Sequence, residues 1–542
     1  MVKIDNKEIK VVILLNSTTV PSWVKYIWDY IENHPKYNVV SIVINSNPIS
    51  NPNASFYRLL RKADRFLFKY SPDPFKRTHL NFNSEVKELN IRPIQKRFSD
   101  YFTPEDIQKI KDVDPELILR FGFRIIRGEI LSIPKYGIWS LHHADHIVNR
   151  GGPPGFWEVV LNEPNTGITL QTLTEDLDGG KIIAKSFIKT DYTSFNRNQA
   201  ALYWSAAELF KNKLDDFSKG EVHLDKVVDN VSLPEFYSHP LYKDPDNLTS
   251  LKIGVRFLAK SSIRKLKDVF YGEQWAIGYA IKSDIESSFF RYKGLYPPKN
   301  CIWADPFCVK KDGELFLFAE QKKGKENGEI ISFKYDAPTK SFKNLGVVLK
   351  EPFHLSYPFV FEQDNHFYMI PESGSINKIV LYESIDFPFK WTQKRVLIDN
   401  IAAYDATLYL HEGLWYLFAS IKPIKGMSAN EQLHIYFTDN LLEGTWQPHK
   451  LNPVKHDARG ARPAGKIFEY KNTIYRPAQI ASYKYGYGIK FFEVIKLTPE
   501  VFEEIPVGET KPLWDKNLLA THTFNFIPGI SVIDFQKRVR RF

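Results

Sequence analysis

The stretch Ala304-Asp305-Pro306-Phe307 is the first of five related segments that decide the fold of the C-terminal half of this chain. The other four are Ser356-Tyr357-Pro358-Phe359, Tyr404-Asp405-Ala406-Thr407, Ala461-Arg462-Pro463-Ala464 and Thr521-His522-Thr523-Phe524. Their second residues lie 52, 48, 57 and 60 positions apart. Each of the first four is followed by a polar turn, a strand rich in aromatic residues and a third strand. A repeat of about 50 residues that can supply four strands is typical of a propeller blade. The sequence therefore predicts an all-β, five-bladed β-propeller over residues 272–542, with Gln274–Ala280 completing the last blade.

The composition fits a folded protein of several domains. The chain has 542 residues, of which 43% are hydrophobic and 25% charged, and a domain usually takes about 150 residues. Its two cysteines, Cys301 and Cys308, exclude a disulfide framework and a cysteine-built zinc site. The apolar run Val11–Leu15 is too short for a signal peptide or a membrane span. The sequence thus predicts a cytoplasmic protein.

The net charge is positive, at +10 from 73 basic and 63 acidic residues. Such a charge suits anionic partners, for example sugar nucleotides, folates, nucleic acids or a membrane surface. Only the tail Lys537–Arg541 concentrates it. A short basic run at a chain end favours a solvated end, and peripheral membrane contact through this tail is the alternative.

The N-terminal part has the pattern of an α/β domain with a Rossmann-like parallel sheet. Buried strands are predicted at Val11–Leu15 and Val39–Ile44, with an amphipathic helix between them. The loop after the first strand has no glycine, so the dinucleotide-binding fingerprint is missing. We assign residues 1–225 to this domain and residues 226–271 to a connector. Residues 46–85 are predicted to form a long loop that could include one short helix.

Further buried strands are predicted at Leu117–Phe121 and Gly137–Leu141, and a long helix at Arg197–Phe217. The second strand runs into the cluster His142-His143-Ala144-Asp145-His146. This spacing matches no metal-binding motif and is more typical of a polar loop, so no metal site is predicted.

The segment Gly137–Ile183 resembles the formyltransferases that use 10-formyltetrahydrofolate, which include the methionyl-tRNA and amino-sugar enzymes. In that family a strand ends in Asn-x-His, and Arg-Gly, Thr-Gly-(Val/Ile)-Thr and Asp-x-Gly follow. This chain has, in the same order, Ser140-Leu141-His142, Arg150-Gly151, Thr166-Gly167-Ile168-Thr169 and Asp178-Gly179-Gly180. The resemblance rests on residues 110–190.

This resemblance implies roles for particular residues. His142 would shuttle the amine proton, Asp178 would orient or balance it, and Ser140 takes the place of the asparagine that stabilises the oxyanion. Folate-binding residues would be Gly122, Asp178, Gly179 and Gly180, and Arg150 would bind the acceptor. Loss of an oxyanion donor costs about 10²–10³ in rate, and serine is a shorter donor than asparagine. The resemblance therefore leaves open whether the site transfers formyl groups.

The propeller segment resembles that of family 43 glycoside hydrolases. Asp305 and Asp405 match the general base and the pKa-tuning aspartate of that family, whereas Arg462 stands where a glutamate acid is expected. Because arginine cannot protonate a leaving oxygen, the resemblance implies sugar binding without hydrolysis. Glu320 and Glu372 are acids at other positions.

Five equivalent positions of the repeat should ring one end of the central channel and bind a sugar. They are Asp305, Tyr357, Asp405, Arg462 and His522. The alternative is that these polar side chains only satisfy one another.

The sequence thus predicts a formyltransferase-like enzyme that acts on an amino sugar or related amine in glycan or cell-envelope biosynthesis. It would use 10-formyltetrahydrofolate and no metal, and its partner would be a small sugar or sugar nucleotide. No nucleic-acid partner is expected, because a propeller replaces the small barrel of the methionyl-tRNA enzymes. Two alternatives stay open: a glycan-binding or scaffolding protein with both sites degenerate, and a propeller that cleaves or transfers glycosyl groups.

Overall fold

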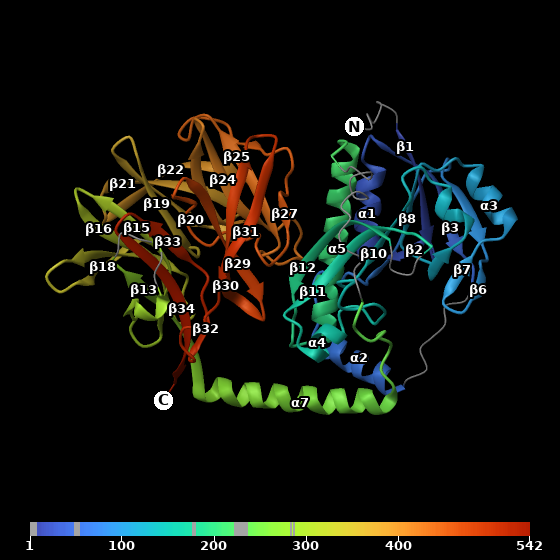
Figure 1. Ribbon diagram of the computed structural model, residues 1–542, viewed down its shortest axis with the longest axis horizontal. Helices are drawn as coiled ribbons and strands as arrows, with labels where there is room; N and C mark the ends of the chain where they lie inside the picture. The colour runs from blue at the N-terminus through green and yellow to red at the C-terminus, as the bar shows by residue number, and fades with distance from the viewer. Residues whose placement is uncertain are drawn as a thin grey trace. The chain divides into compact units, whose positions relative to one another are not determined.

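The computed structural model describes residues 8–47, 55–175, 180–221, 237–281, 285 and 288–541 (Figure 1). The chain divides into two compact units. Unit 1 comprises Met1–Leu258 and Ile424–Met427, and unit 2 comprises Ala259–Pro423 and Ser428–Phe542. Within the described ranges, none of the helices combines the length and the apolar character that crossing a membrane requires.

Unit 1 is built on a seven-stranded sheet, which confirms the predicted parallel α/β architecture. Its strand order is β12-β11-β10-β8-β1-β3-β5. The five strands from β10 to β5 run parallel, and β11 and β12 are antiparallel additions at one edge. The bounds are β1 Ile9–Leu15, β3 Tyr37–Asn45, β5 Lys87–Ile91, β8 Leu117–Arg120, β10 Ile138–His142, β11 Asn165–Thr172 and β12 Lys181–Lys189.

Helices cover both faces of this sheet. The apolar sides of α1 (Ser22–Glu32) and α5 (Phe195–Ser218) form one core with alternate residues of β1 and β8. The other residues of these strands pack with α3 (Pro104–Lys111) on the opposite face. Helix α5 contains the predicted helix Arg197–Phe217, and its N-cap Ser194 accepts a hydrogen bond from a backbone amide of the first turn. Shorter elements are β2 Thr19–Pro21, β4 Arg77–His79, β6 Ile94–Lys96, β7 Ser99–Tyr101, β9 Ile125–Arg127 and α4 Trp157–Leu161.

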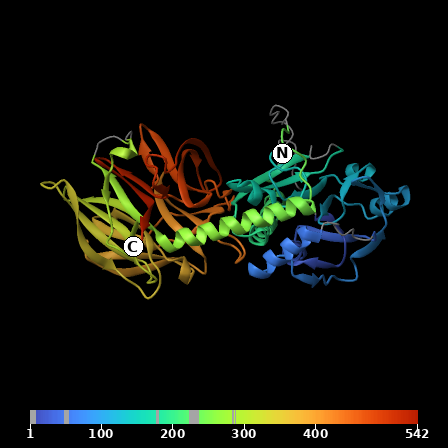
Figure 2. The same ribbon diagram turned by 90° about the horizontal axis from the view of Figure 1, so that it is seen from below.

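Two segments are more regular than the sequence predicted. Residues 46–85, predicted to be mostly loop, contain α2 (Ser55–Leu67), a helix of 13 residues. The predicted connector contains α7 (Asn247–Phe270), a helix of 24 residues drawn in light green in Figure 2. In α7 only Ser250 and Ile253 are buried. The sequence prediction missed this helix although its apolar residues recur with helical spacing from Leu248 onward.

The part of unit 2 that follows α7 is all-β, as predicted, and its described residues form five antiparallel sheets with a propeller-like chain order. Strand β13 (Tyr271–Ala280) pairs along its length with β34 (Ile530–Arg540), so the first and last long strands share a sheet. This sheet also holds β14 Lys293–Leu295, β32 Leu518–Ala520 and β33 Phe524–Ile527. Four further sheets follow in chain order. The first contains β15 Cys301–Lys311, β16 Glu314–Lys323, β17 Glu329–Asp336 and β18 Ser341–Leu349, and the second contains β19 Ser356–Gln363, β20 His366–Glu372, β21 Lys378–Asp386 and β22 Lys390–Asp399. The third contains β23 Ala403–His411, β24 Leu414–Ile421, β25 Gln432–Thr438, β26 Gln447–Pro448 and β27 Lys455–His456, and the fourth contains β28 Phe468–Tyr470, β29 Thr473–Ser482, β30 Lys484–Leu497 and β31 Phe502–Thr510.

The repeated segments have an unusual backbone. Asp305, Tyr357 and Asp405 have φ values of 52°, 44° and 54°, and each lies at a register shift in the first strand of its sheet. A non-glycine residue with positive φ costs of order 1–3 kcal/mol and persists only where its surroundings impose it. These bulges interrupt the regular alternation of side chains between the two faces of each strand, and so they redirect three polar side chains.

The basic tail is ordered. Gln274 pairs with Lys537 and Tyr271 with Arg540, so residues 537–540 belong to β34. Arg538 and Arg540 are nevertheless exposed, so the pairing with β13 orders the backbone of the tail and leaves the prediction of a solvated end standing.

Candidate functional site

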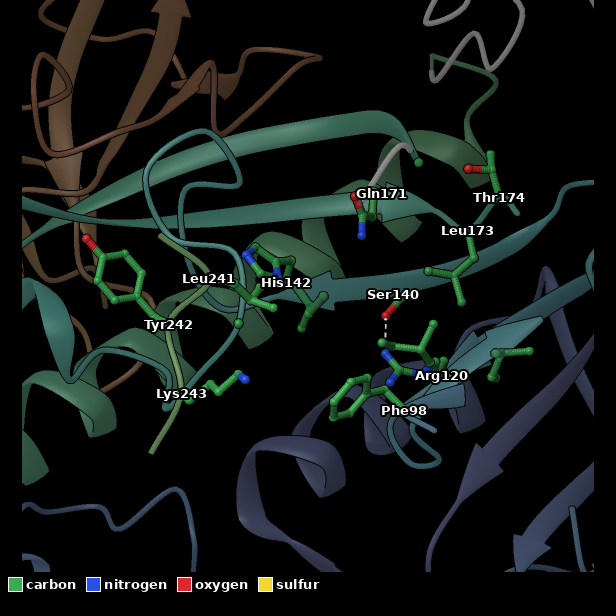
Figure 3. Close-up of a pocket in the computed structure, with 15 residues that line it drawn as sticks. Phe98, Arg120, Ser140, His142, Gln171, Leu173, Thr174, Leu241, Tyr242 and Lys243 are labelled. Atoms are coloured by element: carbon green, nitrogen blue, oxygen red, sulfur yellow. Dashed lines mark hydrogen bonds between the residues drawn. The ribbon is translucent and has the colours of Figure 1, made fainter. Parts of the chain in front are cut away.

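A cavity of about 370 Å³ lies in unit 1 at the carboxyl ends of β8 and β10 (Figure 3). Ligands of open α/β sheets bind at this edge. Ser140 and His142, two residues singled out by the sequence, both line the cavity. They lie two positions apart in β10, so their side chains face the same side of the sheet.

Three polar side chains form a row across neighbouring strands at the cavity. Arg120, the last residue of β8, pairs in register with Ser140 of β10, and Ser140 pairs with Gln171 of β11. Residues directly opposite one another project to the same face. The Arg120 Nη1 donates a hydrogen bond of 2.8 Å to the Ser140 Oγ (Figure 3). The row therefore places a guanidinium and a carboxamide on either side of the serine.

Sequence reasoning missed Arg120 and Gln171. Arg120 ends the apolar run Leu117–Leu119, and a charged residue at the end of a buried strand was the available signal. It is held further by hydrogen bonds of 3.0 and 2.7 Å from Nη2 to the carbonyl oxygens of Phe123 and Arg124. The side chain of Gln171 is buried, and its Oε1 has no hydrogen-bond partner in the described part of the chain. A buried carboxamide with an unsatisfied oxygen is poised to bind a ligand.

The tautomer of His142 follows from its partner. Its Nε2 lies 2.8 Å from the carbonyl oxygen of Asn149. A carbonyl can only accept, so Nε2 carries the proton and Nδ1 keeps a lone pair able to take up another. The Asn149 side chain donates to the Glu158 Oε1 at 3.2 Å. Burial raises the pKa of Glu158 to about 7, so the carboxyl that accepts this hydrogen bond is about half protonated at neutral pH.

Asp178 and Gly179 lie outside the described residues. Gly180 lines the cavity, and a Cβ added there would lie 2.3 Å from the carbonyl oxygen of Thr172. A side chain at this position would therefore displace the neighbouring strand.

Gly122 and Arg150 are not among the residues that line the cavity. A Cβ on Gly122 would lie 2.6 Å from the backbone nitrogen of Asn16, so the glycine allows two chain segments to approach closely. The Arg150 guanidinium lies 4.6 Å from the ring centroid of Tyr237, and its Nε donates to the carbonyl oxygen of His146 at 2.9 Å.

A segment of the predicted connector forms one wall of the cavity. Leu241, Tyr242 and Lys243 line it, and a bridge between Gly151 and Tyr242 holds this segment in place. A Cβ on Gly151 would lie 2.2 Å from the carbonyl oxygen of Tyr242. The glycine of the Arg-Gly pair is therefore required for this contact.

His143 has a packing role. Its ring stacks on Tyr203 at 3.9 Å and meets Trp23 edge-on at 5.5 Å. Burial, aided by the charges of His142 and Arg120, lowers the pKa of His143 to about 3. The neutral imidazole therefore belongs to the aromatic core.

Among the described residues, the one group of three side chains with metal-ligand spacing lies in unit 2 and comprises Asp305, His522 and Asp534. The His522 Nδ1 lies 2.5 Å from the Asp534 Oδ2 and 3.8 Å from the Asp305 Oδ1. Burial alone would lower the pKa of His522, but the two carboxylates outweigh it and raise that pKa to about 9. A protonated imidazole between two carboxylates describes this group better than a metal site does, because a metal needs a neutral histidine.

The predicted ring residues of unit 2 bond to one another and to polar groups beside them. The Arg462 Nε and Nη2 donate to the two carboxylate oxygens of Asp405 at 2.6 and 3.0 Å, and Gln479 adds a bond of 2.8 Å to the same carboxylate. The Tyr357 hydroxyl lies 2.9 Å from the Thr407 Oγ1 and accepts a hydrogen bond of 2.7 Å from the Gly465 amide.

Asp305 accepts hydrogen bonds from the Thr523 hydroxyl at 2.6 Å and the Tyr357 amide at 3.2 Å. Across the strand pair from Ala304 lies Glu320, whose pKa is raised to about 8, first by burial and then by the charge of Asp305. Glu320 is therefore a buried carboxyl that keeps its proton at neutral pH. It could donate this proton to a ligand, which the guanidinium of Arg462 cannot do.

The parallel sheet, the motifs along it and the row at its carboxyl edge define the class of this chain: a formyltransferase-like α/β part fused to an all-β, propeller-like part. The family model described as the N-terminal part of glucosamine inositolphosphorylceramide transferase 1 matches residues 294–518. Apart from Ile424–Met427, that match lies within unit 2.

Individual proteins agree with this division. Glucosamine inositolphosphorylceramide transferase 1 of Oryza sativa subsp. japonica is 38% identical over 214 residues, which are 39% of this chain and 28% of that protein. Methionyl-tRNA formyltransferase of Clostridium acetobutylicum is 32% identical over 149 residues, 26% of this chain and 48% of that enzyme. The chain thus spans about a quarter of the plant relative and about half of the bacterial one. A family 117 glycoside hydrolase from Zobellia galactanivorans is similar in structure at a TM-score of 0.33 and 12% identity, covering 48% of this chain and 90% of its own, a likeness too slight to support an argument.

The predicted cytoplasmic location is wrong. The plant relatives are named for an inositolphosphorylceramide, which is a lipid. The cytoplasmic prediction rested on the absence of a long apolar run, and this absence does not separate a cytoplasmic protein from one that works on a membrane lipid.

Proposed function

We propose that unit 1 transfers a formyl group from 10-formyltetrahydrofolate to the amine of an amino sugar or sugar nucleotide, in the biosynthesis of a glycan. The single observation that carries this proposal is the arrangement at the cavity. His142 has a free lone pair on Nδ1 and follows Ser140 by two positions in β10. Ser140 is the middle member of the row of Arg120, Ser140 and Gln171 at the carboxyl edge of the sheet.

Each side chain has a defined task in this reaction. The amine nitrogen attacks the formyl carbon, a carbon–nitrogen bond forms, and the bond from that carbon to N10 of the folate breaks. His142 takes the proton that the amine loses and returns it to N10, so no oxidant or further reactant is needed. The Arg120 guanidinium and the Gln171 carboxamide supply the donors for the oxyanion that asparagine provides in the formyltransferases.

The lining of the cavity suits the proposed donor. Phe98, Ile125 and Leu173 offer apolar contacts to a flat heteroaromatic ring, and Gly180 leaves the space that a side chain would fill. Lys243 adds a positive charge for an anionic group. Unit 2 would recognise the sugar. An amino sugar as acceptor fits the names of the plant relatives, which contain glucosamine.

Formyl transfer from 10-formyltetrahydrofolate to a panel of amino sugars and their nucleotide-activated forms tests the proposal. We expect His142→Asn to lower kcat about 10²–10⁴-fold, and Gln171→Ala to lower it about 10²–10³-fold with unchanged folate affinity. The matched control is His79→Asn, an exposed histidine of the same unit. Absence of both folate binding and transfer in the unmodified protein would refute the proposal and favour a glycan-binding scaffold.

A further inference from the structure

Helix α7 carries large apolar side chains that face solvent. Eight of them are at least half exposed: Leu248, Leu251, Val255, Leu258, Ile263, Leu266, Val269 and Phe270. A soluble surface seldom presents so many together unless they bind something. The helix has 24 residues and is about 36 Å long, so these side chains form a continuous feature.

The exposed apolar residues lie on one side of α7. At 3.6 residues per turn they fall within an arc of about 140°. The buried residues Ser250 and Ile253, which fix the helix to its own protein, lie outside this arc. The helix therefore has a packed side and a separate apolar stripe, which comprises the eight exposed residues.

Lys252 lies inside this arc, near its edge, and the surface of α7 as a whole is strongly basic. It carries six basic residues and a single acidic one, Asp268. The basic residues are Lys252, Arg256, Lys260, Arg264, Lys265 and Lys267. An apolar stripe bordered by lysine and arginine is the pattern of a helix that lies in the interface of an anionic membrane.

Each end of α7 also has a neighbour within its own unit. In unit 1 the Phe56 amide of α2 donates to the Asn247 Oδ1 at 3.1 Å, and α2 exposes Phe56, Leu59, Phe66 and Leu67 among basic residues. In unit 2 the Arg541 amide donates to the Phe270 carbonyl at 3.0 Å. The exposed Arg538, Arg540 and Arg541 thus adjoin the last turn of α7.

We propose that α7 docks on the surface of an anionic lipid bilayer. The helix lies parallel to the membrane, its apolar stripe enters the boundary between headgroups and acyl chains, and its basic residues contact the headgroups. Charge decides between this occupant and a second copy of the chain. Two α7 helices packed stripe to stripe would bring twelve basic residues together with two acidic ones, whereas anionic headgroups neutralise them.

Flotation of the full chain with vesicles tests this proposal. We expect binding to vesicles of phosphatidylcholine mixed with phosphatidylserine, weaker binding to pure phosphatidylcholine, and a loss of affinity as salt is added. The double variant Leu251→Asp/Leu258→Asp should weaken binding at least about tenfold, because charge replaces inserted apolar surface. Arg256→Glu/Arg264→Glu should weaken it about fivefold for each positive charge removed.

Matched controls separate this surface from general effects. Leu513→Asp changes a leucine of unit 2 that is 76% exposed, and Lys516→Glu reverses an exposed charge outside α7. Both should bind vesicles like the unmodified protein, and circular dichroism should show all variants folded. The proposal fails if the unmodified protein does not float, or if the controls lose as much binding as the α7 variants. It also fails if sedimentation shows a dimer that Leu251→Asp/Leu258→Asp dissociates.

Discussion

The ion pair between Arg462 and Asp405 makes a quantitative prediction about unit 2. Both side chains are buried, at 8% and 2% exposure, and two hydrogen bonds join them. Arg462→Leu would leave the Asp405 carboxylate buried with Gln479 as its remaining partner among these contacts. Breaking a buried pair on one side costs about 3–5 kcal/mol. For a unit of this size that corresponds to a fall of roughly 6 to 20 °C in its melting temperature.

Scanning calorimetry of the full chain measures this change. The control is Arg459→Leu, because Arg459 pairs with Asp457 at the surface of the same unit and should contribute less than about 1 kcal/mol. Removing both buried partners in Asp405→Ala/Arg462→Leu should cost less than the sum of the single changes. Equal effects of Arg462→Leu and Arg459→Leu, or strict additivity in the double variant, would contradict a structural pair and restore both groups as ligand contacts.

Three further predictions concern unit 1. Burial raises the pKa of Glu158 from 4.5 to about 7, so the folded state keeps a proton that the unfolded chain releases and stability falls as pH rises through that window. Glu158→Gln should therefore stabilise the protein above pH 7 by about 3 kcal/mol and not below pH 4.5; urea unfolding at both ends checks this, and a gain independent of pH would contradict it. The effect of His143 on stability has the opposite dependence on pH. Because its pKa is lowered from 6.5 to about 3, its contribution to stability is complete above pH 6.5 and is lost on acidification. His143→Phe should keep the stacking and flatten the acid side of the same stability profile, and an unchanged acid slope would count against this role. Gly167→Ala should cost about 1–3 kcal/mol in thermal unfolding because its Cβ would lie 2.4 Å from the Asp145 nitrogen, whereas Gly508→Ala, with open space around it, should be neutral.

The sequence by itself determined the two architectures and the position of the first site. Apolar runs such as Val11–Leu15 become buried strands because a parallel sheet needs both faces covered. The repeat around Asp305 predicted the all-β unit, since a four-stranded motif that recurs along the chain must pack against copies of itself. The motif Ser140-Leu141-His142 placed the site at the end of a strand, where β10 does end.

Only the tertiary structure decided which side chains share that site. Arg120, Ser140 and Gln171 are far apart in the sequence, and the register of three strands brings them into one row. Strand register depends on the packing of the whole sheet, so local periodicity does not reveal it. The wall around Tyr242 was missed for the same reason, because one bridge to Gly151 holds it. The sequence showed that Arg462 stands where the resemblance expects a glutamate acid, and the fold showed that Arg462 pairs with Asp405. A buried charge needs a counter-charge, and only the fold decides which residue supplies it.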